Sequence, residues 1–113
     1  MSIPRVVLAS DDLNARARVL AAAAPLDIAV VTTPPLGFRP ALLGTSLLIL
    51  DLDRGREQAL DELGAAGDLP PKVVGFLSHV DADLAAAARV AGCDPMPRGR
   101  FWGALPELLR SLT

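Results

Sequence analysis

Polar and charged side chains follow the short apolar runs of this sequence in a pattern that could bind ions. Ser10, Asp11 and Asp12 come directly after the apolar residues 6–9, and Asp51 closes the apolar run 47–50. Further polar residues lie after Asp51 and at the ends of two later runs: Asp53, Ser78, His79 and Arg98. Carboxylates that converge repel one another, which favours a hard divalent cation. A hydroxyl and a cation beside them could bind the oxygens of a phosphoryl group.

The apolar runs predict strands at residues 6–9, 27–32, 47–50, 72–77 and 94–97. Helical patterns fall at residues 13–24, 59–63, 82–90 and 101–112. Strands that alternate with helices predict an α/β class with an open, doubly wound parallel sheet covered on both faces. A second helix should lie within residues 33–46, but prolines and a glycine leave room there for only a turn or two. Ligands gather at the carboxyl ends of such strands, where the polar residues fall.

Length and composition set further limits on the chain. With 113 residues, we expect one domain spanning residues 1–113. The 51% apolar content excludes a disordered chain, and a net charge of −2 argues against nucleic-acid binding. A single cysteine excludes a disulfide scaffold. Without a signal-peptide pattern or a run of about 18 apolar residues, we expect a cytoplasmic protein with no membrane contact.

The order of these residues resembles the receiver domain of bacterial two-component response regulators, which have a chemotaxis-regulator-like fold. The resemblance is carried by Ser10-Asp11-Asp12, by the strand that ends at Asp51, and by Ser78 and Arg98. It implies a flavodoxin-like sheet of five strands in the order 2-1-3-4-5. Residues 87–94 also look like the end of the receiver's fourth helix and the Ala-Gly-Ala-Asp stretch that follows it.

The resemblance also implies a role for each of these positions. Asp51 would be the phosphoacceptor, and Asp11 would hold Mg²⁺ with Asp51 and the backbone carbonyl of Asp53. Ser78 would occupy the place of the switch Ser/Thr, and Arg98 the place of the family's lysine. On this basis the expected cofactor is Mg²⁺.

Several positions depart from the family pattern. Ser10 replaces the first member of the acidic pair, unless Asp11 and Asp12 form that pair in a shifted register. Arg98 presents a planar fork where the family has a compact point charge, which is not a conservative change. Gly55 stands where a proline usually follows the acceptor, and Pro95 stands where the switch aromatic would be. These departures predict a divergent receiver.

Several of these residues have simpler interpretations. Asp11 could cap the helix that follows it, and Ser78 could hydrogen-bond the turn that follows it. His79 is expected in a loop or cap, and Cys93 is expected to be a small buried hydrophobe. Trp102 either packs under the last helix or is exposed for a partner.

The favoured function is a stand-alone, degenerate receiver-like signalling module that docks to proteins such as a kinase, a phosphotransfer protein or an output protein. In receivers, the face of helix four, strand five and helix five commonly mediates dimerisation. On this chain it would include residues 85–88, Arg89, Arg100 and Trp102. The alternative is a working Mg²⁺-dependent phosphoacceptor at Asp51, whose chemistry would be limited to its own phosphorylation and dephosphorylation. An α/β enzyme or cofactor carrier is disfavoured because no nucleophile–base pair or phosphate loop is present.

Overall fold

The sheet has five parallel strands in the order β2-β1-β3-β4-β5, which confirms the predicted fold class and topology. It is seen in a computed structural model that describes residues 3–78 and 81–113. The strands are β1 (Arg5–Ala9), β2 (Ala29–Thr33), β3 (Leu47–Asp51), β4 (Lys72–Leu77) and β5 (Asp94–Pro97). β3 lies at the centre of the sheet, so Asp51 ends the most enclosed strand.

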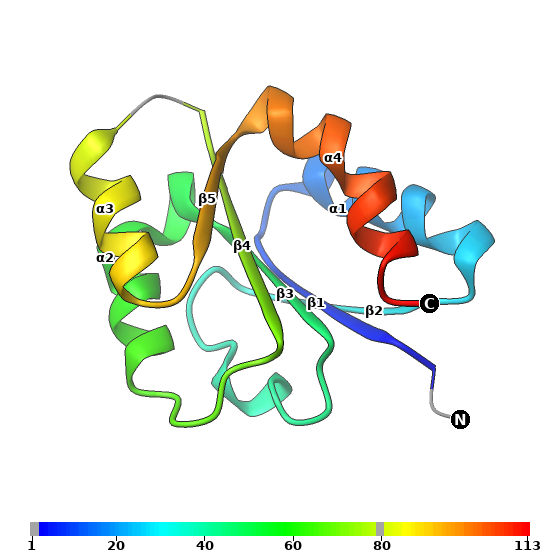
Figure 1. The fold of residues 1–113 in the computed structure, drawn as a ribbon, viewed down its shortest axis with the longest axis horizontal. Coiled ribbons are helices and arrows are strands. Elements are labelled where there is room, and N and C mark those ends of the chain that lie inside the picture. Colours follow the sequence, from blue (N-terminus) through cyan, green and yellow to red (C-terminus); the bar gives the residue numbers. More distant parts are fainter. Residues whose placement is uncertain (1–2, 79–80) are drawn as a thin grey trace.

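Helices cover both faces of the sheet (Figure 1). They are α1 (Leu13–Ala23), α2 (Leu52–Gly64), α3 (Ala82–Val90) and α4 (Arg98–Arg110), with short 3₁₀ turns at Ala24–Leu26 and Arg39–Ala41. α1 and α4 lie side by side on one face, and α2 and α3 lie on the other. In the part of the chain that the structure describes, none of the helices combines the length and apolarity needed to cross a membrane.

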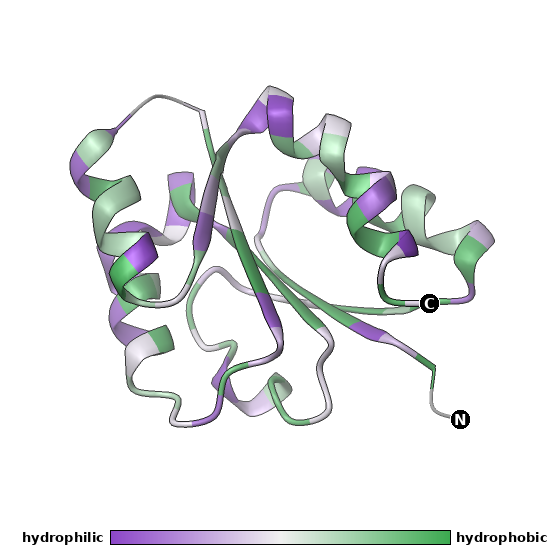
Figure 2. Cartoon of the chain, in the orientation of Figure 1, coloured by the Kyte–Doolittle hydropathy of each residue, from purple (hydrophilic) through white to green (hydrophobic). Residues whose placement is uncertain are grey.

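Two apolar layers hold the sheet between the helices. One face of the sheet, with Val7, Leu48 and Leu50, packs against residues of α2 and α3. The opposite face packs against α1 and α4, because side chains alternate along a strand. Figure 2 shows that the central strands are hydrophobic along most of their length. Strands apolar on both faces are typical of a covered parallel sheet.

α2 is longer than the helix predicted at residues 59–63. It begins at Leu52, directly after β3, because the Asp51 side chain accepts a hydrogen bond from the Arg54 N–H and caps the first turn. The helix is interrupted at Arg56, whose φ of 49° and ψ of −142° lie outside the helical region. This kink separates the first turn of α2, which directly follows β3, from the rest of the helix, which contains the predicted residues 59–63.

The starts of β2 and α4 also differ from the prediction. β2 starts at Ala29 because Asp27 adopts a left-handed φ of 55° after the 3₁₀ turn and so cannot extend the strand. α4 starts at Arg98 rather than at residue 101, so Arg98 is the first helical residue after the two-proline strand β5. Arg98 therefore begins a helix directly after the edge strand.

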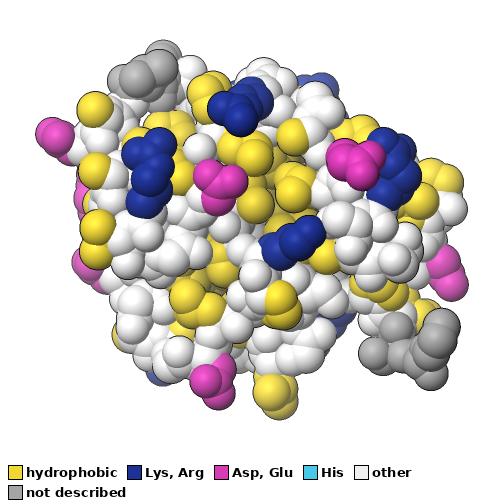
Figure 3. All heavy atoms as spheres, in the orientation of Figure 1, with side chains coloured by type: hydrophobic (Ala, Val, Ile, Leu, Met, Phe, Trp, Pro, Cys, Tyr) yellow, Lys and Arg dark blue, Asp and Glu magenta, His cyan; other side chains and the backbone are white. Residues whose placement is uncertain are grey.

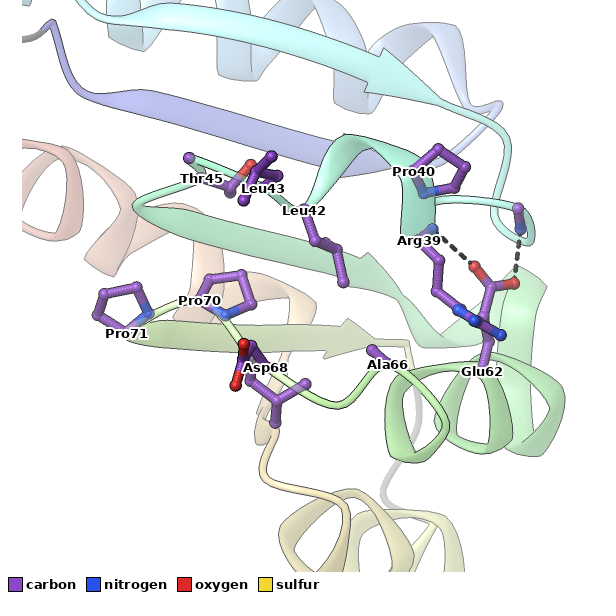
Figure 4. Close-up of a pocket in the computed structure, with 13 residues that line it drawn as sticks. Arg39, Pro40, Leu42, Leu43, Thr45, Glu62, Ala66, Asp68, Pro70 and Pro71 are labelled. Carbon is purple, nitrogen blue, oxygen red and sulfur yellow. Dashed lines mark hydrogen bonds between the residues drawn. The ribbon is translucent and has the colours of Figure 1, made fainter.

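Residues 34–46 form no α-helix, as their prolines predict, and contain only the 3₁₀ turn at Arg39–Ala41. The Glu62 carboxylate of α2 holds this segment by accepting hydrogen bonds from the backbone N–H groups of Gly37 at 2.6 Å and Arg39 at 3.0 Å (Figure 4). Phe38 between them is fully buried. A side chain of α2 thus anchors the segment through its backbone donors, beside a hollow that Leu42 and Pro70 help to line.

Gly75 in β4 should tolerate no larger residue. A Cβ there would lie 2.6 Å from Cδ1 of Leu52 and 2.9 Å from Sγ of Cys93, and both side chains are buried. We expect Gly75→Ala to lower the free energy of unfolding by about 1–3 kcal/mol through overpacking. Gly103→Ala is the matched control, because its Cβ meets nothing within 4 Å, and it should gain about 0.5–1 kcal/mol in the helix. Urea unfolding of both variants measures the difference, and equal stabilities would contradict this packing.

Candidate functional site

The Asp51 carboxylate is enclosed at the carboxyl end of β3. Its side chain is 0% exposed. Oδ2 accepts a hydrogen bond of 2.7 Å from the Ser10 hydroxyl at the end of β1, and Oδ1 accepts one of 3.3 Å from the Arg54 N–H. Both oxygens of the predicted acceptor therefore already have donors within the chain.

Burial raises the pKa of Asp51 above its usual range. The hydrogen bond from Ser10, the positive charge of Arg98 and the Arg54 N–H act in the opposite direction but do not cancel it. Removing a charge from water is costly unless counter-charges compensate for it. Burial therefore carries a free-energy cost for the ionised Asp51 side chain, and the cations around it reduce that cost.

The Arg54 guanidinium connects Asp51 to Asp11. Its Nη1 lies 2.8 Å from Oδ1 of Asp11, and its Nε lies 3.4 Å from Oδ2 of Asp51. The Asp11 side chain is 60% exposed, and its link to Asp51 within the described part of the chain runs through this guanidinium. Sequence reasoning missed Arg54, because only the immediate start of α2 after β3 turns this arginine back toward the strand end.

Arg98 is the second cation of the site and reaches three carboxylates. Its Nε donates to Oδ2 of Asp53 at 2.9 Å, and its Nη2 donates to Oδ2 of Asp12 at 3.3 Å. Nη2 also lies 3.9 Å from Oδ2 of Asp51. The guanidinium carbon lies 4.7 Å from the centre of the Phe76 ring, a cation–π arrangement. The structure thus brings Arg98 to Asp51, as predicted from its position, and adds two further partners.

The Asp53 side chain points to Ser78 and Arg98. Oδ1 accepts from the Ser78 N–H at 2.8 Å and Oδ2 accepts from its hydroxyl at 2.6 Å. Burial opposes ionisation of Asp53, but the hydrogen bonds from Ser78 and Arg98 outweigh it and lower its pKa. The prediction considered only the backbone carbonyl of Asp53, as a metal ligand. The side chain instead links the ends of β3 and β4 to Arg98.

Asp12, and not Asp11, caps α1. Its Oδ1 accepts from the N–H groups of Asn14 at 2.9 Å and Ala15 at 3.4 Å. Burial acts to raise its pKa, but those two hydrogen bonds and Arg98 lower it overall. The suggestion that Asp11 caps this helix is therefore wrong, because the cap needs the residue directly before Leu13. Ser10 occupies the inward position of the acidic cluster. Asp11 reaches Asp51 through Arg54, and Asp12 reaches it through Arg98 and through its own backbone N–H, which donates to the Ser10 hydroxyl at 3.1 Å.

The residues present do not fit a Mg²⁺ ion while both guanidinium groups are in place. Mg²⁺ requires near-octahedral oxygen ligands, and one carboxylate oxygen of Asp11 and one of Asp51 already face the Arg54 guanidinium. Within residues 3–78 and 81–113, no group of three or more acidic, histidine or cysteine side chains is arranged to hold a metal ion. The arrangement is a closed network of carboxylates and arginines across three strand ends.

The remaining candidates have structural environments. Cys93 is buried, as predicted, and burial raises the pKa of its thiol to about 12. Trp102 is half-buried, 5.6 Å from Phe76 between ring centres, with Arg18 of α1 4.3 Å above its ring. It therefore packs on the α1 side of α4. His79 lies outside the described residues.

The opposite pKa shifts of Asp51 and Asp53 predict opposite responses to the same substitution. Asp51→Asn removes a desolvated charge, so it should stabilise the protein near pH 7. That gain should vanish as the pH falls and the wild-type carboxyl becomes protonated. Asp53→Asn should cost about 1–3 kcal/mol near pH 7, and this loss should shrink as the pH falls through the lowered pKa of Asp53. Unfolding free energies measured from acid to neutral pH test this, and changes of the same sign would contradict it.

The comparisons with known proteins agree with this architecture. No protein-family model matches the sequence, and no curated protein matches it either. A solved structure described as a response regulator from Thermotoga maritima superposes with a TM-score of 0.75 at 19% sequence identity, and the match covers 98% of this chain and 98% of that chain. The chain thus has the fold of a response-regulator receiver domain over nearly its whole length.

Proposed function

We propose that this chain is a receiver-like signalling module that works by docking to proteins and does not use Asp51 as a phosphoacceptor. The observation that carries the proposal is the enclosure of Asp51 by Ser10, Arg54 and Arg98. The shared fold supports a receiver-type scaffold. Fold alone does not set function, so the proposal depends on the contacts at the strand ends.

Phosphoryl transfer to Asp51 would require a free carboxylate oxygen and a cation placed between that oxygen and the donor. In this chain Oδ2 already accepts from Ser10 and faces two guanidinium groups, and Oδ1 caps the first turn of α2. An incoming phosphoryl group would have to break these contacts in a site with no exposed Asp51 surface. The contacts that offset the free-energy cost of burying Asp51 therefore oppose its phosphorylation.

The docking surface that we propose is the edge formed by α3, β5 and α4. Pro95 and Pro97 remove two backbone donors from this edge strand, which opposes pairing with a strand of another chain. Val90 at the end of α3 is 90% exposed, and Arg89 and Arg100 are exposed beside this edge. Figure 3 shows hydrophobic side chains flanked by both basic and acidic ones on the face that carries β5. A partner would therefore bind through side chains, as is typical of an apolar centre with a charged rim.

The working-phosphoacceptor alternative is tested with a small-molecule phosphodonor such as acetyl phosphate and Mg²⁺. We expect the intact mass of the wild-type chain to stay unchanged, as in the Asp51→Asn control. The added mass of a phosphoryl group in the wild type, absent from Asp51→Asn, would favour the alternative and contradict the proposal.

The docking surface is tested by its self-association. We expect a dimer in sedimentation equilibrium at high protein concentration, and we expect Val90→Glu to make the chain monomeric, because a charge would be buried at the contact. Leu13→Glu is the matched control, since Leu13 is 76% exposed on α1, across the sheet from α3. A dimer that survives Val90→Glu, or a wild type that is monomeric, would contradict a homodimer at this edge.

A further inference from the structure

We propose that Arg54 is a built-in counter-cation that takes the place of a divalent metal ion and keeps the acidic strand ends assembled without one. This inference rests on the proposed function, since it says what holds the enclosed site together. It assigns to Arg54 a positioning role that neither the sequence pattern nor the fold likeness contains.

The Arg54 side chain lies among the acidic strand ends. Its guanidinium lies between a carboxylate from the end of β1, Asp11, and one from the end of β3, Asp51. A divalent ion shared by two such carboxylates would neutralise the same repulsion. The first turn of α2 fixes this geometry, because the Arg54 N–H also donates to Asp51. The backbone N–H and the side chain of Arg54 thus both contact the Asp51 carboxylate.

The site contains more acidic side chains than basic ones. Two guanidinium groups, of Arg54 and Arg98, face the carboxylates of Asp11, Asp12, Asp51 and Asp53. Removal of Arg54 would leave the paired oxygens of Asp11 and Asp51 without their nearest cation. Arg98 could not replace it, because its Nε is bonded to Asp53 and its planar group lies over Phe76.

The Arg54 guanidinium is a tethered cation, and a Mg²⁺ ion would be a free cation that competes with it. Arg54 is attached two residues beyond Leu52, so it is present at its site at a high effective concentration. A Mg²⁺ ion would have to displace it and also give up tightly held water. The guanidinium should therefore exclude divalent ions from the wild-type chain, and its removal should admit them.

The experiment titrates Mn²⁺, and in parallel Mg²⁺, into the wild type and into Arg54→Ala by calorimetry, with melting temperatures recorded with and without each ion. We expect Arg54→Ala to bind Mn²⁺ at least about tenfold more tightly than the wild type. Its melting temperature should rise with Mn²⁺, because an ion that binds only the native state stabilises it. The wild type should melt at the same temperature in Mn²⁺ and in a chelator.

Two further variants make the result specific. Arg56→Ala removes an arginine of the same helix that pairs with Asp81 and Glu57, so it should behave as the wild type does. Asp51→Asn combined with Arg54→Ala should lose the gained Mn²⁺ affinity. Arg54→Gln, which keeps much of the side-chain volume, serves as the second test if Arg54→Ala does not fold.

The inference is overturned if the folded Arg54 variants bind Mn²⁺ no more tightly than Arg56→Ala. It is also overturned if the wild type binds Mn²⁺ as tightly as they do. A wild type that excludes Mn²⁺ and is nonetheless phosphorylated on Asp51 would contradict the proposed function and leave the role of Arg54 intact. If the wild type is not phosphorylated and the Arg54 variants bind Mn²⁺ no more tightly than Arg56→Ala, the role of Arg54 is contradicted and the proposed function is kept.

Discussion

The Arg98 guanidinium joins the carboxyl ends of three strands through ionic contacts. It bonds Asp53 after β3 and Asp12 after β1, lies near Asp51, and itself follows β5. Charge-assisted bonds of this kind are strong when they are partly shielded from water, and the side chain of Arg98 is only 24% exposed. The polar edge of the sheet depends on this side chain, since it compensates several carboxylates that would otherwise repel one another.

The buried Asp51 explains why the neighbouring backbone has an unusual course. A carboxylate at the end of the central strand needs donors, and the immediate start of α2 supplies the Arg54 N–H and guanidinium. That early start places an extra turn before the main helix, and the chain accommodates it by the non-helical conformation of Arg56. Gly75 completes the arrangement, because the absence of a side chain there leaves room for Leu52 beneath the first turn.

The same scaffold separates a closed polar edge from open side surfaces. The strand-end residues are bound to one another, so they have little capacity left for a ligand. The β5 edge, in contrast, has exposed apolar and basic side chains and two prolines that prevent continuous strand pairing. This division is what the proposed role, recognition of proteins through a surface, depends on.

Local patterns in the sequence were sufficient to predict the succession of strands and helices along the chain, because apolar runs and prolines act over a few residues. They also placed Asp51, Ser78 and Arg98 at one edge, since parallel strands end together. The sequence could not reveal that Arg54 and the Asp53 side chain belong to this edge, because both depend on where α2 begins. Only the tertiary structure decided which carboxylate faces which cation, since those pairs join residues as far apart as Asp12 and Arg98 and are set by desolvation and side-chain reach.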